Sequence, residues 1–326
     1  MGDEKHLHKY RLKSVMFFLG TAGFYSSSLR NEKKSMLSVA ESAIQSALEL
    51  GITHIDTANI YGNGESEAVI GGIFRKDQSL REKIFLQTKC GIKFSKTDNK
   101  IYYDTSKNHI ITQVEASLKK MGTDRLDSLL IHRPNPLMSA QEISEAVVTL
   151  VDSGKILNFG VSNFSPFQIE LLRKNIPFPI YANQVQLNLI HTILLDTGIE
   201  GFSESIEYPI GNGTLEYCQF NDIIIQVWSP IARGILTANN TVPMSPNQNL
   251  KISILKEKLS NLSIKYECTP ESILIAWLLK IPCKVNPIIG SLDFRTMKAC
   301  VDGNKVELND EEWYILYRLS KGKNFP

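Results

Sequence analysis

The stretch LDSLLIHRPNPLMSAQEISEAVVTLVDSGKILNFGVSNFSPFQIELLRKN, residues 126–175, holds two strand-and-helix pairs in succession. Its runs at 126–132 and 156–162 are almost continuously apolar and are too short for a buried helix. Such runs are typical of parallel strands that are covered on both faces. We therefore expect two parallel strands here.

The segments that follow these two runs have the spacing of helices. The segment 139–154 has apolar residues at helical intervals and ends in Gly154, a residue suited to a helix C-terminus. The segment 165–175 begins with Ser165 as a candidate N-cap, and Pro166 occupies the first helical position. The order strand, helix, strand, helix predicts a parallel sheet with crossover helices.

The same alternation extends along the rest of the chain. Helical spacing recurs, for example at 38–51 and 109–122. Six further apolar runs of strand length lie at 15–20, 52–56, 84–89, 180–186, 222–229 and 285–291. Roughly eight strand-and-helix units in one register favour a closed (β/α)8 barrel, the TIM barrel of the α/β class, over an open doubly wound sheet of about five or six strands.

Two segments interrupt this rhythm. Residues 93–108 form a long polar stretch after the third expected strand, and residues 191–214 contain several glycines without a clear period. We expect a loop in the first segment and an insertion or lid in the second. Because no linker separates a second domain, the chain is expected to form one domain over 1–326.

Composition excludes several classes of protein. Of 326 residues, 43% are hydrophobic and 21% charged, which argues against disorder and against a coiled coil. The 36 Lys and Arg nearly balance the 34 Asp and Glu, so a net charge of +2 gives no field for nucleic acid or anionic membranes. Five cysteines without a Cys-x-x-Cys pair, and no long apolar run, predict a reduced, cytoplasmic protein without a membrane span. No cluster of His, Cys and carboxylates has metal-ligand spacing, so no metal is expected.

Four ionisable side chains lie at or just after the ends of the second, third and fourth expected strands. They are Asp56, Tyr61, Lys89 and His132. Taken singly, each has an ordinary structural explanation: a turn carboxylate, a packing tyrosine, a solvated lysine and a structural histidine. In a barrel, however, these strand ends meet at one mouth, where active sites lie.

This set suits the reduction of a carbonyl group. A lysine ammonium next to a phenol stabilises the phenolate, and a carboxylate behind the lysine holds the ammonium in place. Tyr61, Lys89 and Asp56 would then relay a proton to an oxygen that develops negative charge, while His132 orients that oxygen. The chemistry needs a hydride source beside the set, and no G-x-G-x-x-G motif follows a strand to supply a Rossmann site.

Several segments of the chain resemble the aldo-keto reductases. GITHIDTANIYGNGESEAVIG (51–71) is similar to the family's Asp-and-Tyr segment, IFLQTKCGI (84–92) to its Lys segment, and LDSLLIHRPNP (126–136) to its His segment. Further similar segments are GKILNFGVSNF (154–164), YANQVQLN (181–188), VWSPIARGIL (227–236) and NPIIGS (286–291). The similarity spans most of the chain and is strongest with the bacterial oxidoreductase branch.

The resemblance implies roles for individual residues. It implies that Asp56, Tyr61, Lys89 and His132 form a catalytic tetrad in which Tyr61 is the general acid during reduction. It also implies a nicotinamide cofactor, NADPH being favoured over NADH. The cofactor-binding residues that it implies are Gly20, Thr21, Ser162, Asn163, Gln184, Trp228, Ser229, Pro230, Ile231, Ala232, Gly234, Gly290, Ser291 and Arg295.

Within that implied set the residues have different tasks. Ser162, Asn163 and Gln184 match residues that bind the nicotinamide carboxamide, and Trp228 matches an aromatic residue that stacks on the nicotinamide ring, although an ordinary core tryptophan is the alternative. The turn 229–234 matches the family's pyrophosphate loop.

The adenosine end departs from the family pattern. The family has an arginine for the 2′-phosphate where this chain has Thr296, and Arg295 lies one residue earlier. That shift turns the side chain by roughly 100° on a helix. Arg295 and Lys298 remain candidates for the phosphate, and a solvated helix face is the alternative.

Two other functions share this fold. A cofactor-binding regulatory module with little turnover, like the potassium-channel β subunits of this superfamily, is one alternative. A barrel aldolase that uses Lys89 as a Schiff base is the other. The reductase hypothesis expects a small carbonyl compound as substrate and a monomeric protein. The segments 93–108 and 191–214 are expected to select a sugar, aromatic or small hydrophobic substrate.

Overall fold

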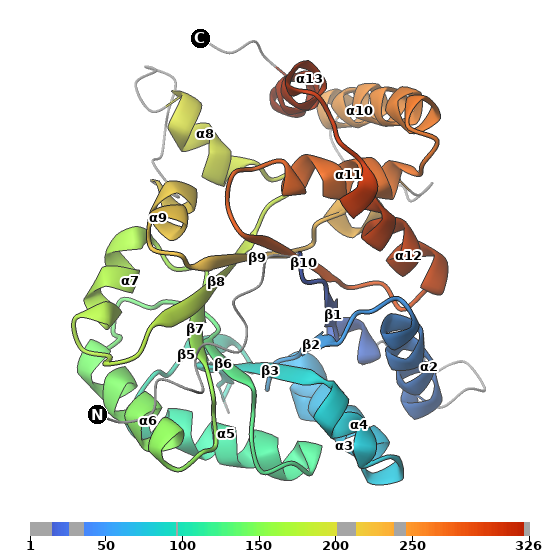
Figure 1. The fold of residues 1–326 in the computed structure, drawn as a ribbon. Coiled ribbons are helices and arrows are strands. Elements are labelled where there is room, and N and C mark those ends of the chain that lie inside the picture. Colours follow the sequence, from blue (N-terminus) through green and yellow to red (C-terminus); the bar gives the residue numbers. More distant parts are fainter. Residues whose placement is uncertain (1–14, 26–35, 96, 201–212, 238–245, 323–326) are drawn as a thin grey trace. The chain divides into compact units, whose positions relative to one another are not determined.

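Eight strands form a closed barrel in the order β1-β10-β9-β8-β7-β6-β3-β2. This arrangement is seen in a computed structural model that describes residues 15–25, 36–95, 97–200, 213–237 and 246–322 (Figure 1). Helices follow the strands along the chain, so the predicted (β/α)8 barrel is confirmed. The chain divides into two compact units, residues 1–184 with 290–292 and residues 185–289 with 293–326, and each is described by itself. That the chain is one domain stays a prediction.

The first unit contains the parallel strands that end in the candidate catalytic residues. Its strands are β1 (Phe18–Gly20), β2 (His54–Asp56), β3 (Phe85–Cys90), β6 (Ser128–Ile131), β7 (Phe159–Ser162) and most of β8 (Ile180–Gln186). Consecutive pairs from β1 through β2, β3, β6 and β7 to β8 are parallel. In register, Asp56 lies opposite Gln87, and Lys89 lies opposite Leu130. The strand register therefore places the ends of β2, β3 and β6 side by side.

Five helices cover these strands, each packed against the next one along the chain. They are α2 (Met36–Glu49), α3 (Glu65–Lys76), α5 (Lys107–Met121), α6 (Ala140–Asp152) and α7 (Pro166–Arg173). A one-turn helix, α4 (Ser79–Lys83), and two 3-10 turns, η1 (Ala22–Phe24) and η2 (Tyr61–Gly64), complete the unit. Figure 1 shows α5, α6 and α7 following one another along the outside of the strands.

The expected helix boundaries match the observed caps. The Ser165 hydroxyl accepts a hydrogen bond from the backbone N–H of Gln168, the Gln168 side chain bonds back to Ser165, and Pro166 is the first helical residue. Gly122 ends α5 with a φ of 66°, a left-handed conformation that glycine adopts without strain. Local capping chemistry thus fixes where these helices begin and end.

The expected loop at 93–108 contains regular structure. Strands β4 (Ile92–Phe94) and β5 (Ile101–Tyr103) pair antiparallel to form a hairpin, and α5 already begins at Lys107. The side chains of β5 are all exposed, so this strand has no buried face to produce an apolar alternation in the sequence. The loop expectation is corrected to a surface hairpin followed by a helix.

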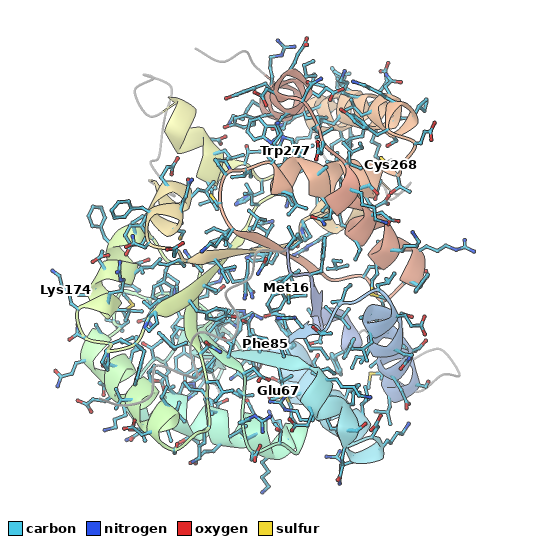
Figure 2. The ribbon with its side chains drawn as sticks, in the orientation of Figure 1. Met16, Glu67, Phe85, Lys174, Cys268 and Trp277 are labelled. Atoms are coloured by element: carbon cyan, nitrogen blue, oxygen red, sulfur yellow. The ribbon has the colours of Figure 1, made fainter. Side chains whose placement is uncertain are left out.

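The second unit contains β9 (Ile224–Trp228) and β10 (Val285–Ile289), which pair in parallel. Its helices are α8 (Ile193–Glu200), α9 (Thr214–Phe220), α10 (Pro246–Lys265), α11 (Pro270–Leu279), α12 (Phe294–Asp302) and α13 (Asp310–Lys321), with the short turns η3 (Ala232–Gly234) and η4 (Gly303–Lys305). Trp277 lies on α11 (Figure 2). Its ring stacks on that of Trp313 of α13 with ring centres 5.3 Å apart, and each indole N–H donates to the other residue's carbonyl. This reciprocal contact joins α11 to α13.

The segment 191–214, expected to be an insertion or lid, contains α8 and the first residue of α9. Residues 201–212 of that segment lie outside the described residues. None of the helices in the described part of the chain has the length and apolarity needed to cross a bilayer.

Candidate active site

A buried ion pair connects the ends of β2 and β3. The Lys89 ammonium donates hydrogen bonds to both carboxylate oxygens of Asp56, at 2.8 and 2.7 Å, and to the Thr57 carbonyl oxygen at 2.7 Å. The Lys89 side chain is 0% exposed and that of Asp56 3% exposed. All three ammonium protons therefore have acceptors, which is the condition under which a charged lysine is tolerated inside a protein.

Two buried amides hold the same carboxylate from the other side. The side-chain amide nitrogens of Gln87 and Gln184 donate to Asp56 Oδ1 at 2.7 and 2.9 Å, and the Tyr181 hydroxyl donates to the Gln87 amide oxygen. Gln87 and Tyr181 were not among the residues predicted from the sequence. Gln87 lies two residues before Lys89 on β3, so strand alternation places both side chains on one face, and this signal could have found it.

Tyr61 begins the η2 turn just after β2. Its ring centre lies 5.0 Å from the Lys89 ammonium nitrogen. Gly62 and Asn63 follow with φ near 58°, and a Cβ on Gly62 would come within 2.2 Å of the Tyr25 ring. Only glycine fits Gly62's position, because it needs both the left-handed conformation and the close approach of another side chain. This turn brings the phenol over the ion pair.

His132 follows β6 and faces the same tyrosine. Its backbone N–H donates to the Cys90 carbonyl at 2.8 Å, which fixes it beside the end of β3. Its ring contacts the Tyr61 ring edge to face, with centres 5.9 Å apart. Its Nδ1 is buried and has no hydrogen-bond partner among the described residues. The structure thus brings together all four side chains that were selected from the sequence.

Burial and the neighbouring charges together shift the pKa values in this cluster. Desolvation raises the pKa of the Tyr61 phenol, and this effect outweighs the opposing charge and hydrogen bond of Lys89. Desolvation also opposes the charge on Lys89, but Asp56 and Tyr61 together raise the Lys89 pKa above its usual value. Burial, reinforced by the positive charges of Lys89 and Arg133, lowers the His132 pKa well below its usual value.

The expected effect of the ammonium on Tyr61 is present in the structure, because the charge and the hydrogen bond of Lys89 both lower the Tyr61 pKa. Desolvation raises that pKa by more, so the phenol, whose reference pKa is already near 10, is protonated at neutral pH. The site therefore combines a protonated tyrosine, a charged lysine and a neutral imidazole at neutral pH. Such a set can donate a proton and can then stabilise the phenolate that remains.

A second buried contact supports β3 from outside. Glu67 lies on α3 (Figure 2) and is fully buried. It accepts a hydrogen bond of 2.8 Å from the Thr88 hydroxyl, and the Lys120 ammonium of α5 lies 3.5 Å from its other carboxylate oxygen. A Cβ on Gly71 would lie 2.1 Å from the Lys120 carbonyl oxygen, so the two helices pack in close contact. These contacts fix the strand that carries Lys89.

Several implied nicotinamide residues lie at the ends of β1, β7 and β8. Asn163 donates from its amide to the Ser162 hydroxyl at 2.7 Å, and that hydroxyl donates to the Gln184 carbonyl at 2.9 Å. Thr21, directly after Gly20, is fully buried, and its hydroxyl has no partner among the described residues. A cluster of amides and hydroxyls with one unsatisfied buried oxygen fits the polar carboxamide of a nicotinamide.

The other implied cofactor residues lie mostly in the second unit. Trp228 ends β9, and the turn that contains Ser229, Pro230, Ile231, Ala232 and Gly234 follows it. Ser229, Ala232, Arg233 and Gly234 all have φ between 50° and 76°. Left-handed residues in succession turn backbone N–H groups toward one side, an arrangement that suits a phosphate.

The expected 2′-phosphate residue lies at the start of α12. Arg295 is exposed in the first turn of this helix, and Asp293 caps the helix by accepting from the Thr296 N–H at 2.8 Å. Gly290 and Ser291 follow β10 and belong to the first unit. Among the described residues no group of three or more His, Cys, Asp and Glu is arranged to hold a metal ion.

Comparison with known proteins shows the family of this chain. The model of the Aldo/keto reductase family matches residues 17–321. Oxidoreductase YdhF of Escherichia coli and a 6-dehydroglucose reductase of Agrobacterium fabrum are each 34% identical over 288 residues, which is 87% of this chain and 88% of theirs. The glycerol dehydrogenase structure from Gluconobacter oxydans has the same fold, with a TM-score of 0.75, 23% identity, and coverage of 94% of this chain and 92% of that one. The chain therefore belongs to the aldo/keto reductase family and is an oxidoreductase of that family.

Proposed function

We propose that this protein reduces an aldehyde or ketone to an alcohol with NADPH, and that Tyr61 is the general acid. The observation that carries the proposal is the arrangement of the protonated Tyr61 phenol over the buried Lys89–Asp56 ion pair. A bound nicotinamide supplies the hydride to the carbonyl carbon. The residues of this chain supply the proton that the carbonyl oxygen then needs.

The proton moves from the Tyr61 hydroxyl to the substrate oxygen. As it leaves, negative charge develops on the phenol oxygen, and the Lys89 ammonium stabilises that charge in surroundings with little water. Asp56 keeps the ammonium in position. The neutral His132 imidazole donates a hydrogen bond to the same substrate oxygen and so orients the carbonyl.

The residues at the ends of β7 and β8 would hold the nicotinamide carboxamide. Ser162 and Asn163 are linked by hydrogen bonds, and Gln184 is fixed by its bond to Asp56 Oδ1. The contact between Gln184 and Asp56 connects this amide cluster directly to the ion pair. Thr21, with its unsatisfied hydroxyl, would add a further hydrogen-bonding group for the carboxamide.

The preference for NADPH depends on Arg295. Asp293 already caps α12, so a 2′-phosphate there would rely on the Arg295 guanidinium for its charge, rather than on the helix N-terminus. The variant Arg295→Ala is expected to raise the KM for NADPH about tenfold, because one ionic contact is lost, and to leave the KM for NADH unchanged. Equal effects on both cofactors would contradict this assignment.

A sugar that carries a carbonyl group is the first substrate class to test, because a relative 34% identical to this chain is named a 6-dehydroglucose reductase. Small aromatic and aliphatic aldehydes complete the panel. We further propose that the protein acts as a monomer in the cytoplasm, on small molecules.

The mechanism is tested with Tyr61→Phe. The change removes only the hydroxyl, so the variant should bind NADPH with unchanged affinity, measured by fluorescence, while kcat falls about 10²- to 10⁴-fold. Tyr314→Phe is the matched control, because Tyr314 is half exposed on α13, and it should keep the full rate. Equal carbonyl reduction by wild type and Tyr61→Phe would refute the mechanism.

The aldolase alternative conflicts with the state of Lys89. A Schiff base requires a neutral amine with access to substrate, whereas this ammonium is fully buried, has three hydrogen-bond acceptors, and has a raised pKa. Borohydride trapping should therefore leave Lys89 unmodified in the presence of carbonyl compounds. Covalent capture at Lys89 would support the aldolase instead.

A further inference from the structure

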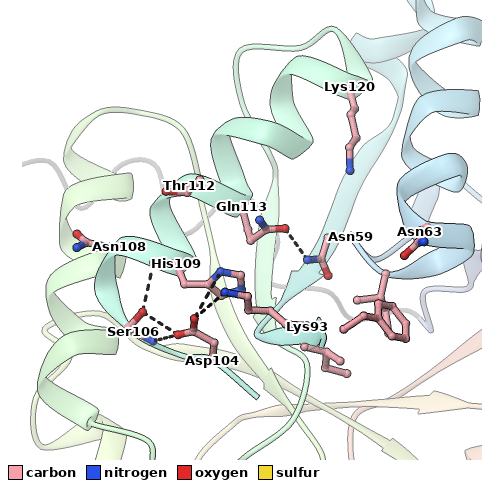
Figure 3. Close-up of a pocket in the computed structure, with 13 residues that line it drawn as sticks. Asn59, Asn63, Lys93, Asp104, Ser106, Asn108, His109, Thr112, Gln113 and Lys120 are labelled. Atoms are coloured by element: carbon pink, nitrogen blue, oxygen red, sulfur yellow. Dashed lines mark hydrogen bonds and ion pairs between the residues drawn. The ribbon is translucent and has the colours of Figure 1, made fainter. Parts of the chain in front are cut away.

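A pocket of 590 Å³ lies beside the η2 turn, between the β4–β5 hairpin and α5. Its volume falls in the range of small-molecule sites, roughly 300–1,000 Å³. None of the four tetrad residues lines it, although Asn59 and Ile60 immediately precede Tyr61. Figure 3 shows two polar groups of this pocket, with His109 beside Asp104 and Lys93, and Asn59 beside Gln113.

The first of these groups is the imidazole of His109 on α5. Its side chain is 8% exposed, and its Nε2 atom is buried without a hydrogen-bond partner among the described residues. Burial lowers the His109 pKa, so the ring is neutral at pH 7. The Asp104 carboxylate lies 3.9 Å from Nδ1 and favours the ring proton there. Nε2 is then a hydrogen-bond acceptor that lacks a donor.

The second group is the Asn59 side chain at the end of β2. Asn59 is 9% exposed, and its amide nitrogen donates to the Gln113 amide oxygen at 2.8 Å. That bond fixes the orientation of the amide. Its oxygen is buried and has no partner among the described residues. Two residues that line the pocket therefore each carry a buried acceptor, and leaving such groups unsatisfied costs about 1–3 kcal/mol each.

The charges around the pocket exclude two classes of ligand. An anion offers further acceptors, which cannot satisfy Nε2 or the Asn59 oxygen. The lysines that line the pocket also already have carboxylate partners, Lys93 with Asp104 at 3.2 Å and Lys120 with Glu67 at 3.5 Å. A cation supplies donors, but Asp104, the carboxylate that lines the pocket, is already paired with Lys93.

We propose that this pocket binds an uncharged polyhydroxy compound, a sugar or polyol, at a site separate from the catalytic tetrad. Hydroxyl groups donate to His109 Nε2 and to the Asn59 oxygen without adding charge. Thr112, Asn108 and Asn63 offer both donors and acceptors to further hydroxyls. Ile60, Ile92 and Phe94 supply the apolar surface that the C–H face of a sugar ring needs. This site is independent of the proposed reductase activity.

The test measures binding of D-glucose and sorbitol to the intact protein by calorimetry, with inorganic phosphate as the anionic comparison. Thr112→Trp fills the pocket from its exposed residue on α5, and Lys119→Trp places the same side chain on an exposed position of α5 outside the pocket. We expect Thr112→Trp to raise the polyol Kd more than tenfold and Lys119→Trp to leave it unchanged. His109→Phe keeps the ring but removes the acceptor, and should raise the Kd about tenfold.

Two further measurements locate the bound polyol. Polyol binding should survive in Tyr61→Phe and be abolished in Thr112→Trp, which distinguishes this pocket from the catalytic site. An unchanged melting temperature of Thr112→Trp shows that the loss of binding is not due to misfolding. In a long-range ¹H–¹⁵N spectrum, the His109 signal, assigned by its loss in His109→Phe, should show an unprotonated Nε2 whose shift changes with glucose.

Three results would overturn the proposal. The first is no saturable polyol binding up to about 100 mM, far above the millimolar range of weak specific sites. The second is polyol binding that Thr112→Trp does not change. The third is a proton on Nε2, or tighter binding of phosphate than of polyol in the same pocket.

Discussion

Replacing Asp56 by Asn should leave a buried ammonium without its counter-charge. Lys89 would keep the Thr57 carbonyl and at most one amide oxygen as acceptors, in place of two carboxylate oxygens. Breaking a buried ion pair from one side costs about 3–5 kcal/mol. Loss of the Lys89 proton sets an upper limit, because deprotonating at pH 7 a group whose normal pKa is about 10.4 costs about 4.6 kcal/mol. We therefore expect Asp56→Asn to lower the free energy of unfolding by about 3–4.6 kcal/mol at pH 7.

The pH dependence of this loss follows from linkage. If Lys89 is neutral in the folded variant and charged in its unfolded state, unfolding takes up a proton below the unfolded pKa of about 10.4. The variant then gains stability relative to wild type as pH rises from 7 to 9, by at most about 1.4 kcal/mol per pH unit. Urea titration followed by tryptophan fluorescence, without added nicotinamide, measures both quantities.

A second buried pair provides the matched control. Arg81 and Asp127 lie 2.9 Å apart with side chains 10% and 11% exposed. In Asp127→Asn, Arg81 keeps its bonds to the Ile84 and Arg125 carbonyls, so the loss should be smaller, about 1–3 kcal/mol. It should also be independent of pH between 7 and 9, because arginine does not deprotonate there.

The double variant Asp56→Asn with Lys89→Met completes the cycle. It removes both charges, so it should be more stable than Asp56→Asn alone. The reasoning is refuted if Asp56→Asn costs less than about 1 kcal/mol, or if its cost is as independent of pH as that of the Arg81 control. A double variant whose loss equals the sum of both single losses would also refute it.

Two further predictions concern the framework of the first unit. Burial lowers the His54 pKa to about 4, so the unfolded state binds a proton first as the pH falls below 6.5, and up to about 3 kcal/mol of stability is lost by pH 4. His54→Phe should therefore make the free energy of unfolding, measured by urea titration, less dependent on pH between 6.5 and 4. An unchanged pH dependence would contradict this prediction. Gly71→Ala should destabilise the protein by about 1–3 kcal/mol or more in the same assay, because its Cβ would lie 2.1 Å from the Lys120 backbone oxygen. Gly72→Ala, whose Cβ meets only the flexible side-chain ends of Leu37 and Arg75, is the control and should cost less.

The barrel could be predicted from sequence because its strands are buried on both faces. Runs such as 126–132 are therefore continuously apolar, and Ser165 and Gly122 mark where helices begin and end. The β4–β5 hairpin escaped prediction because Ile101, Tyr102 and Tyr103 are all exposed, so their pairing leaves no pattern of burial.

The candidate site was predictable in membership and less so in its electrostatics. Asp56, Lys89 and His132 could be selected because they end adjacent strands, and the chain order fixes where those ends meet. The raised pKa of Tyr61 depends on how completely other residues exclude water from it, which no local spacing records. Gln87 hydrogen-bonds Asp56 through an amide that, in a sequence, resembles any polar strand residue.

The β4–β5 hairpin separates what can be varied in this protein from what cannot. Its three exposed side chains, Ile101, Tyr102 and Tyr103, are 43–54% exposed and contribute little to the interior. Saturation libraries at 101–103 should therefore yield mostly folded clones. The contact between α3 and α5 at Gly71 tolerates no added carbon without displacing the backbone of α5. Laboratory evolution of substrate range should begin on the hairpin and leave the contact between α3 and α5 unchanged.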